Sequence, residues 1–234
     1  MNILIIIPAF NEEENIRKLI QKIHEVKYKN TVDILVINDH STDGTSFICK
    51  EMGVSVVNLP CNLGIGGAVQ TGYKFAALYD YDFAIQVDGD GQHNPEFIES
   101  LIEPIIQGNA DIVIGSRYIN QCGFQSSSMR RLGIRYLKYL INMLTGLKIT
   151  DPTSGYRACS KEIIKLFSIN YPKDYPEPES IMYIKRKGFR VSEVPVIMHE
   201  REGGKSSINF HRSIYYMIKV SLAIVFDKIR KESF

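Results

Sequence analysis

The sequence predicts an α/β fold with a mostly parallel central sheet that carries helices on both faces. Apolar runs of strand length alternate with helix-like segments through the first half of the chain, in the order β-α-β-α-β-α-β-α-β. The connections between these segments are short. Such an alternation is typical of parallel sheets whose crossover helices cover both sides.

The composition is that of an ordinary globular protein. The 234 residues can bury one substantial core, and the apolar share of 44% and charged share of 23% are typical of folded domains. A net charge of +2 argues against a strongly basic nucleic-acid-binding protein. The four cysteines are scattered without zinc-type spacing, and the chain opens without a basic signal-peptide lead. We therefore expect a cytoplasmic protein with reduced thiols.

Five strands are expected in the first half, because five runs are apolar and rich in β-branched residues. They cover residues 2–7, 33–37, 54–58, 83–87 and 111–115. Helices are expected over residues 12–26, 46–52, 62–79 and 95–107. Asn11 is expected to cap the first of these helices, with Glu12, Glu13 and Glu14 in its first turn, where the helix dipole favours acidic side chains.

Three glycines, Gly64, Gly66 and Gly67, stand at the start of the helix expected over 62–79. A dinucleotide-binding fingerprint would need another glycine at position 69, where the chain has Val69, so that match fails. We expect these glycines to allow close backbone packing, or the approach of a ligand, beside the first strand.

The second half is less regular. A loop over 121–128 is expected to lead into a basic helix over 129–144, which carries Arg130, Arg131, Arg135 and Lys138. These cations either form a solvated helix face or meet anionic lipid. Loops are expected over 151–157 and 171–179, helices over 161–167 and 180–187, a strand over 190–198 and a charged loop over 200–207.

The tail is an amphipathic helix in this interpretation. Its apolar part spans about 13 residues and is interrupted by Lys219, whereas roughly 20 apolar residues are needed to cross a bilayer. Two alternatives stay open: the tail lies in a membrane interface, or it packs on the core. We expect residues 1–207 to form the main domain and residues 208–234 to form the tail helix.

The strongest chemical signal is Asp88-Gly89-Asp90, directly after the strand expected over 83–87. Two carboxylates at this spacing can converge on one hard cation if the backbone bends at Gly89. Ligands of open α/β sheets collect outside the carboxyl ends of the strands. We expect a divalent ion there that holds a negatively charged ligand, most plausibly a diphosphate.

Two other interpretations of this segment are open. An isolated Asp-x-Asp is often only a turn or a cap. A calcium loop would use Asp88, Asp90, Gln92 and Glu99, but it needs a glycine where the chain has His93, and a helix where the chain has a strand.

Five segments together resemble family 2 glycosyltransferases. They are Ile-Ile-Ile-Pro-Ala-Phe-Asn-Glu (5–12), Val-Ile-Asn-Asp-His-Ser-Thr-Asp-Gly-Thr (36–45), Asn-Leu-Gly-x-Gly (62–66), Asp-Gly-Asp-Gly-Gln (88–92) and Gly-Ser-Arg (115–117). Within the family, the chain resembles the polyprenyl-phosphate sugar synthases, of the dolichyl-phosphate mannose synthase type, over roughly residues 1–207. The resemblance implies a GT-A fold with a Rossmann-like nucleotide-binding half, a nucleotide-sugar donor, and Mg²⁺ or Mn²⁺ as cofactor.

The resemblance also implies roles for individual residues. The donor-binding set is Pro8, Phe10, Glu12, Asp39, Gly67, Asp88, Gly89, Asp90, Arg117, Arg201 and Lys205. Within it, Pro8, Phe10 and Glu12 line the nucleoside pocket, with Asp39 near the base or ribose. Asp88, Asp90 and Gln92 surround the metal, and Arg117, Arg201 and Lys205 lie near the phosphates.

Two positions depart from the family pattern. Asn38 stands where many relatives have a first Asp, which affects base recognition. Residues 176–179, Pro-Glu-Pro-Glu, replace an apolar-Gln-x-Glu stretch, which leaves the acceptor open.

The expected reaction is metal-dependent, inverting transfer of a sugar from a UDP-, GDP- or dTDP-sugar to a polyprenyl (dolichyl or undecaprenyl) phosphate. The expected catalytic residues are Asp88, Asp90, Arg117, Asp151 and Glu179. Asp151 and Glu179 are the candidate general bases, which a hydroxyl acceptor needs and an ionised phosphate does not. Each has an alternative role as a loop cap or as the partner of a nearby arginine.

We expect the protein to be peripheral at the inner face of the cell membrane. Other functions left open are transfer to a hydroxyl of a lipid-linked or cell-surface polysaccharide, and a non-catalytic nucleotide-sugar-binding subunit that docks on a membrane protein. A sugar nucleotidyltransferase is disfavoured, because residues 8–14 contain no Gly, Lys or Arg to form a triphosphate loop.

Overall fold

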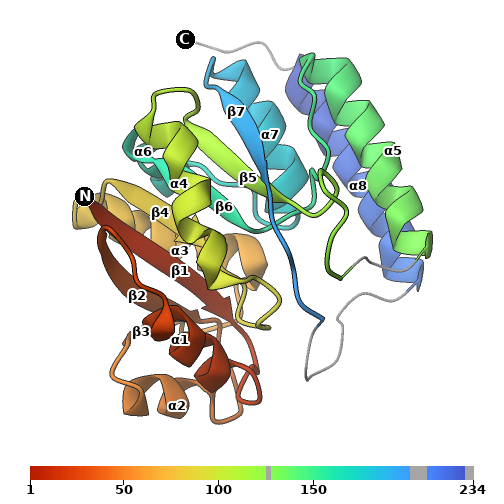
Figure 1. Cartoon of the computed structure of the whole chain (residues 1–234). Helices are drawn as coiled ribbons and strands as arrows, with labels where there is room; N and C mark the ends of the chain where they lie inside the picture. Colours follow the sequence, from red (N-terminus) through yellow and green to blue (C-terminus); the bar gives the residue numbers. More distant parts are fainter. Residues whose placement is uncertain (125–127, 201–209, 230–234) are drawn as a thin grey trace.

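Strands of the central sheet run through the middle of the molecule in Figure 1, a computed structural model that describes residues 1–124, 128–200 and 210–229. Within these residues seven strands form one sheet in the order β3-β2-β1-β4-β6-β5-β7. The strands are β1 (Asn2–Ala9), β2 (Thr31–Asn38), β3 (Ser55–Asn58), β4 (Phe83–Gln86), β5 (Ile112–Ser116), β6 (Arg157–Ser160) and β7 (Val191–Pro195). β6 is antiparallel to both of its neighbours, and the other pairings are parallel.

Helices pack on both faces of the sheet because every other side chain of a strand points to the same face. Ile3, Ile5 and Ile7 of β1 pack in one core cluster, and Leu4 and Ile6 pack in a second on the opposite face. The first cluster includes residues of α1 (Ile16–Glu25), α2 (Thr45–Glu51) and α4 (Ile98–Ile106). The second includes residues of α3 (Gly64–Leu78), α6 (Lys161–Ile169) and α7 (Pro176–Arg186).

A third apolar cluster joins the last two long helices to the sheet. It contains Ile114 of β5, Leu137 and Ile141 of α5 (Ser128–Thr145), and Val220 and Ile224 of α8 (Phe210–Ile229). Figure 1 shows α5 and α8 side by side at one edge of the molecule. No helix among the described residues has the length and apolarity that a membrane span requires.

The predicted α/β architecture is confirmed, including the mostly parallel sheet and the C-terminal helix. The tail has a core-packed side, because Val220 and Ile224 are fully buried, yet Ile218, Leu222 and Phe226 are exposed. The predicted division at residue 207 falls within 201–209, outside the described residues, so it stays a prediction.

Several element boundaries were predicted wrongly. The first helix begins at Ile16 rather than Glu12, and its first turn contains no acidic residue. Asn11 does not cap it: Asn11 has φ 54°, and its side-chain oxygen accepts from the backbone N–H of Thr42. The segment 12–15 is instead a turn, in which Glu12 accepts backbone hydrogen bonds from Asn15 and Ile16.

The helix expected over 95–107 begins as the 3-10 turn η1 (Pro95–Phe97) and continues as α4. The strand expected over 190–198 is limited to β7.

Two further differences lie in the second half. β6 was not predicted, because its four residues follow a turn-rich loop and show no alternation that would indicate a strand. Helix α7 begins at Pro176, inside the segment expected to be a loop. Proline is tolerated in the first turn of a helix because the N–H groups there have no intrahelical partner, so these prolines mark a helix start.

Candidate active site

Chemically active side chains gather at one edge of the sheet. Asp39 follows β2, Asp88 follows β4 and Arg117 follows β5, and these strands point the same way. β6 runs in the opposite direction, so its first residue, Arg157, pairs with Gln86 at the end of β4. Because β6 lies between β4 and β5, this edge brings Arg157 between Asp88 and Arg117.

The backbone of the loop after β4 rests on the end of β1. The N–H of Gly89 donates to the carbonyl of Pro8 at 3.3 Å. A Cβ at position 89 would lie 3.0 Å from that carbonyl oxygen and 3.4 Å from the side chain of Ala9. Any other residue would push these neighbours a few tenths of an ångström away, so the close approach favours glycine between the two carboxylates.

Asp88 is oriented by its neighbours. Its Oδ1 accepts from Nε2 of Gln86 at 2.9 Å, and its backbone N–H donates to Nδ1 of His93 at 3.0 Å. The His93 ring is buried and stacks on Tyr156, with ring centroids 4.7 Å apart and planes 8° from parallel. The position of Asp88 is therefore set by packed, buried groups rather than by a free loop.

Gly155 allows a second segment to contact the same carboxylate. A Cβ there would lie 2.8 Å from Nε2 of Gln86 and 2.9 Å from Oδ2 of Asp88. Gly155 belongs to the loop expected over 151–157, directly before β6. The close approach shows that the 151–157 loop forms one wall beside Asp88.

Arg117 and Asp151 form a buried ion pair. Nε of Arg117 donates to Oδ2 of Asp151 at 2.6 Å, and its Nη2 donates to Oδ1 at 2.8 Å. Asp151 is fully buried and Arg117 nearly so. Burial lowers the pKa of Arg117, but the hydrogen bonds and charge of Asp151 outweigh it and hold that pKa above its ordinary value. This geometry favours the arginine-partner role of Asp151; its role as a general base stays a prediction.

Arg157 and Glu177 were not among the predicted site residues. The guanidinium of Arg157 is buried and donates to the carbonyls of Ser154 and Pro152 and to Oγ of Ser180. Burial raises the pKa of Glu177 to about 7; the charge of Asp88 also raises it, and Arg157 opposes the shift. A carboxyl group that is half protonated near neutral pH therefore lies within electrostatic reach of Asp88 and Arg157.

The donor atoms fit a divalent cation that a ligand helps to hold. Within the described part of the chain, no three His, Cys, Asp or Glu side chains gather so that they could hold a metal ion alone. Asp88 and Asp90 offer carboxylate oxygens, which Mg²⁺ and Mn²⁺ prefer, and the Asp88 side chain is 34% exposed. Magnesium is commonly bound by one or two carboxylates together with substrate phosphates. The pair therefore suits an ion shared with a phosphate ligand.

The remaining predicted metal ligand is held by other contacts. Nε2 of Gln92 donates to the carbonyl of His199, whose N–H donates back to the carbonyl of Gln92. The calcium-loop alternative lacks its last ligand, because Oε1 of Glu99 accepts from the backbone N–H of Lys29.

Asp39 supports the start of α3. Its two carboxylate oxygens accept from the backbone N–H groups of Leu63, at 2.7 Å, and Gly64, at 2.9 Å. Asp39 is buried, so its contact with a base or ribose stays a prediction. Gly67 lies in the first turn of the same helix, where a Cβ would meet Leu63.

The predicted nucleoside residues lie along the end of β1 and the turn after it. Pro8 is buried in β1, whereas Phe10 is 49% exposed. Glu12 is partly buried, and its Oε2 accepts from the side chain of Asn15. Phe10 is thus the predicted residue with the most accessible surface for stacking against a base.

Three other predicted residues stay predictions. Glu179 lies in the first turn of α7, two residues after Glu177. Arg201 and Lys205 lie outside the described residues.

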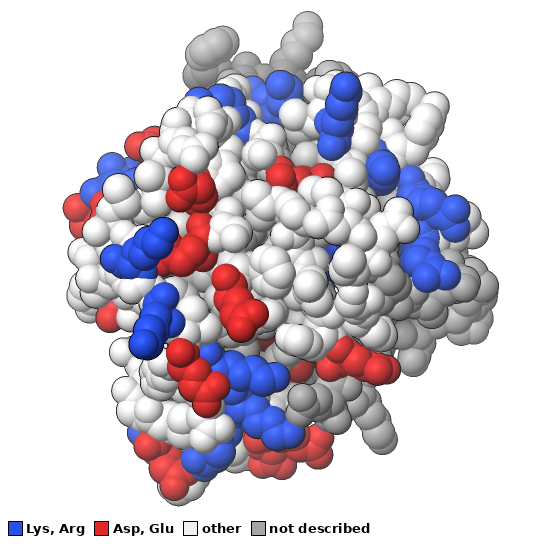
Figure 2. All heavy atoms as spheres, in the orientation of Figure 1, with Lys and Arg blue, Asp and Glu red and all other residues white. Residues whose placement is uncertain are grey.

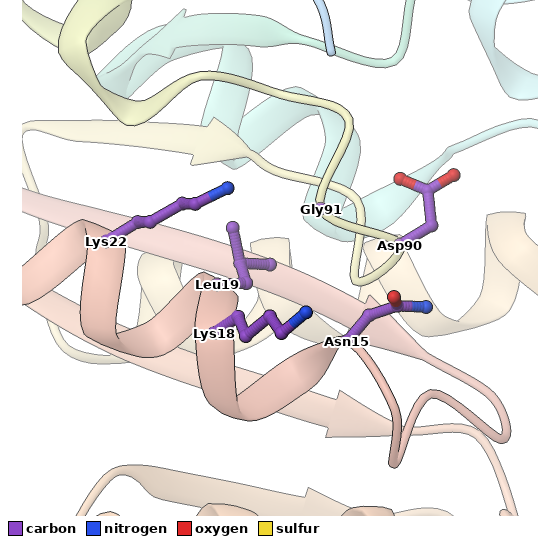
Figure 3. Close-up of a pocket in the computed structure, with 6 residues that line it drawn as sticks. All are labelled: Asn15, Lys18, Leu19, Lys22, Asp90 and Gly91. Atoms are coloured by element: carbon purple, nitrogen blue, oxygen red, sulfur yellow. The ribbon is translucent and has the colours of Figure 1, made fainter. Parts of the chain in front are cut away.

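A small pocket lies between α1 and the loop after β4 (Figure 3). Its lining residues are Asn15, Lys18, Leu19, Lys22, Asp90 and Gly91. In Figure 3 the carboxylate of Asp90 points away from Lys18 and Lys22. The pocket therefore lies on the side of Asp90 away from its carboxylate oxygens, and we assign no ligand to it.

Two site residues that were not predicted, His93 and Arg157, could have been found from the motifs next to them. His93 follows the Asp-x-Asp segment by three residues, and Arg157 ends the Ser-Gly-Tyr-Arg segment. The indication for Glu177 was weaker: it lies in the Pro-Glu-Pro-Glu segment (176–179), which departs from the family pattern.

Comparison with known proteins gives a consistent result. The family model described as "Glycosyl transferase family 2" matches residues 4–167. The chain is 32% identical over 214 residues to a UDP-N-acetylglucosamine–dolichyl-phosphate N-acetylglucosaminyltransferase of Methanococcus voltae, covering 83% of this chain and 84% of that protein. It is 31% identical over 228 residues to the polyprenol monophosphomannose synthase of Mycolicibacterium smegmatis, covering 93% and 85%.

The fold is similar to that of a solved enzyme. The crystal structure of glucosyl-3-phosphoglycerate synthase from Mycobacterium tuberculosis, in complex with Mn²⁺, UDP and glucosyl-3-phosphoglycerate, matches with a TM-score of 0.74. The match covers 99% of this chain and 81% of that one at 20% identity. The expected GT-A architecture is confirmed by this likeness of fold.

Proposed function

Because the chain belongs to glycosyl transferase family 2, we propose that it transfers a sugar from a nucleotide-sugar donor to a polyprenyl phosphate at the cytoplasmic face of a membrane. The observation that carries this proposal is the edge of the sheet where Asp88 lies within electrostatic reach of Arg117 and follows the strand that pairs with Arg157, with Asp90 two residues further along the same loop. The names of the relatives support a polyprenyl phosphate as the acceptor.

The donor diphosphate would meet both carboxylates and cations at this edge. Asp88 and Asp90 would hold Mg²⁺ or Mn²⁺, which supplies positive charge to the departing nucleotide diphosphate. Arg117 is held in one orientation by Asp151, and its fixed positive charge would add to that of the metal near the phosphates. We place Arg201 and Lys205 with the same phosphates by resemblance.

The acceptor determines whether a base is needed. A lipid phosphate is already ionised at neutral pH and attacks the anomeric carbon directly, which inverts its configuration. Attack by a lipid phosphate requires no general base. This agrees with the state of Asp151, which is buried and paired with Arg117. Glu177, whose pKa burial raises to about 7, would be partly protonated at neutral pH, within electrostatic reach of Asp88.

The proposal is tested by transfer assays with purified protein, Mn²⁺, and polyprenyl phosphate as acceptor. The donor is first chosen by thermal shift with UDP-, GDP- and dTDP-sugars. The product should release its sugar in mild acid, as a phosphodiester-linked sugar does. A product that resists mild acid would indicate transfer to a hydroxyl, and binding of donor without transfer or hydrolysis would indicate a non-catalytic subunit; either result overturns the proposal.

Two variants separate the metal site from the fold. Asp90→Asn keeps the side-chain shape and removes a charge, so transfer should fall at least a hundredfold while the melting temperature changes little. Asp174→Asn is a matched control, because Asp174 is exposed in the loop before α7 and pairs with Lys219 of α8. Undiminished transfer by Asp90→Asn would remove the metal assignment.

A further inference from the structure

Helix α5 presents a second apolar stripe to solvent, opposite the one that it buries. Ile134, Leu137 and Ile141 are buried in the core. The outer stripe follows the helical spacing i, i+4, i+7, i+11 and consists of Leu132 (60% exposed), Tyr136 (47%), Tyr139 (69%) and Met143 (59%). Single exposed apolar side chains are ordinary, but a continuous stripe marks an interaction surface.

Helix α8 extends this stripe. Its residues Ile218, Leu222 and Val225 are exposed at the spacing i, i+4, i+7, while Val220 and Ile224 are buried. The two helices are adjacent in Figure 1. The hydroxyl groups of Tyr136 and Ser221 lie 3.1 Å apart.

A Cβ at Gly133 of α5 would lie 3.3 Å from Sδ of Met217 on α8. The small residue thus lets the helices approach closely, and their exposed apolar residues form one surface. We call it the α5–α8 face, defined by Leu132, Tyr136, Tyr139, Met143, Ile218, Leu222 and Val225.

One side of this face is basic. Helix α5 contains no acidic residue and four cationic residues, which are Arg130, Arg131, Arg135 and Lys138. On the helix, Arg131, Arg135 and Lys138 fall together on the flank between the buried and the outer stripe. Figure 2 shows Lys and Arg side chains gathered at the edge where α5 lies in Figure 1.

We propose that the α5–α8 face docks the protein on an anionic lipid surface, with the outer stripe in the headgroup and upper acyl region and the basic flank on lipid phosphates. An amphipathic helix with aromatic residues on its apolar side and cations beside it is the pattern of interfacial helices. Each Lys or Arg near an anionic surface adds about fivefold to the affinity for it at physiological salt. A protein partner would not require this one-sided positive charge.

The proposal deepens the proposed function, since a lipid-linked acceptor would be met at that surface. Only this link to the acceptor rests on the proposed function, because lipid docking itself is measured without donor or acceptor.

The test is co-sedimentation of the full chain with vesicles of phosphatidylcholine containing or lacking phosphatidylglycerol. Wild-type protein should bind the anionic vesicles, and added salt should weaken binding. Tyr139→Ser/Met143→Ser should lower the partition coefficient at least tenfold. Phe47→Ser/Ile169→Ser is the matched control, because these side chains are 71% and 84% exposed on other helices; it should bind like wild type.

A charge variant tests the basic flank separately. Arg135→Gln/Lys138→Gln should lose at least tenfold affinity for anionic vesicles and show a weaker salt dependence. Circular dichroism melting of every variant should match wild type, because the exchanged side chains are exposed or partly exposed. Failure of wild type to bind, or equal losses in the stripe and control variants, would overturn the proposal. The proposal would also be overturned if the wild-type protein formed a dimer that the stripe variant did not, because the face would then be a protein interface.

Activity separates this inference from the proposed function. The stripe variant should transfer sugar to a short-chain, water-soluble polyprenyl phosphate as well as wild type does, but poorly to a long-chain acceptor in vesicles. Equal losses on both acceptors would count against docking. Vesicle binding without transfer to any polyprenyl phosphate would support docking and refute only the proposed function.

Discussion

Replacement of Asp151 by alanine tests whether the Arg117–Asp151 pair is a fixed structural support of the site. The carboxylate is fully buried and accepts two guanidinium N–H bonds and the backbone N–H of Arg117. Its removal would leave the guanidinium in a nearly closed space without its partner. Breaking a buried pair in this way costs about 3–5 kcal/mol of unfolding free energy.

Urea unfolding at pH 7, followed by far-UV circular dichroism, measures this loss. Arg190→Met supplies a control, because Arg190 forms a similar forked pair with Asp111 but is 55% exposed, so its loss should be much smaller. The double variant Asp151→Leu/Arg117→Met should recover most of the stability that Asp151→Ala loses, because no buried charge remains unpaired. A loss below about 1 kcal/mol for Asp151→Ala, or no recovery in the double variant, would refute this reasoning.

Two further predictions follow from the same edge of the sheet. The pKa of Glu177 is raised from 4.5 to about 7, so the stability linked to its protonated form is complete below pH 4.5 and is lost as the pH rises through 7. Glu177→Gln lacks this pH dependence. Its free energy of unfolding should therefore rise relative to wild type by as much as about 3 kcal/mol between pH 4.5 and pH 8. Parallel pH profiles of the two proteins, measured by urea unfolding in EDTA, would contradict this. Gly155→Ala would press a methyl group against Gln86 and Asp88, so donor affinity in Mn²⁺, measured by calorimetry, should fall at least tenfold. Unchanged donor affinity would show that this wall is free to move.

The parallel half of the fold could be predicted from the sequence because the local sequence pattern of each strand and helix indicates its structure. The five strands of the first half are apolar runs, and an aspartate follows two of them within two residues, Asp39 after β2 and Asp88 after β4. Asp88 and Asp90 were singled out for the same reason, whereas the role of Arg117 was implied by the family resemblance. Their positions at strand ends follow from the alternation alone.

The second half was less predictable because tertiary contacts decide it. β6 has four residues and is stabilised by strands on both sides, so its own sequence contains little strand signal. Helix α7 begins with prolines that also suit a loop. Glu177 acquires its raised pKa from burial and from Asp88, nearly ninety positions earlier in the chain, which no local pattern can indicate.

The antiparallel strand β6 makes the region between β5 and β6 an exchangeable module. Ile114 of β5 pairs with Arg157 of β6, so the chain leaves the sheet and returns to it at neighbouring points. The entropy of closing such an excursion rises only slowly with its length. Segments of different length and chemistry, among them α5 with its exposed stripe, can therefore be grafted between residues 118 and 148, ahead of the buried Asp151, while the strands that hold Asp88 and Arg157 keep their register. One scaffold for the donor can in this way serve acceptors delivered from very different surroundings.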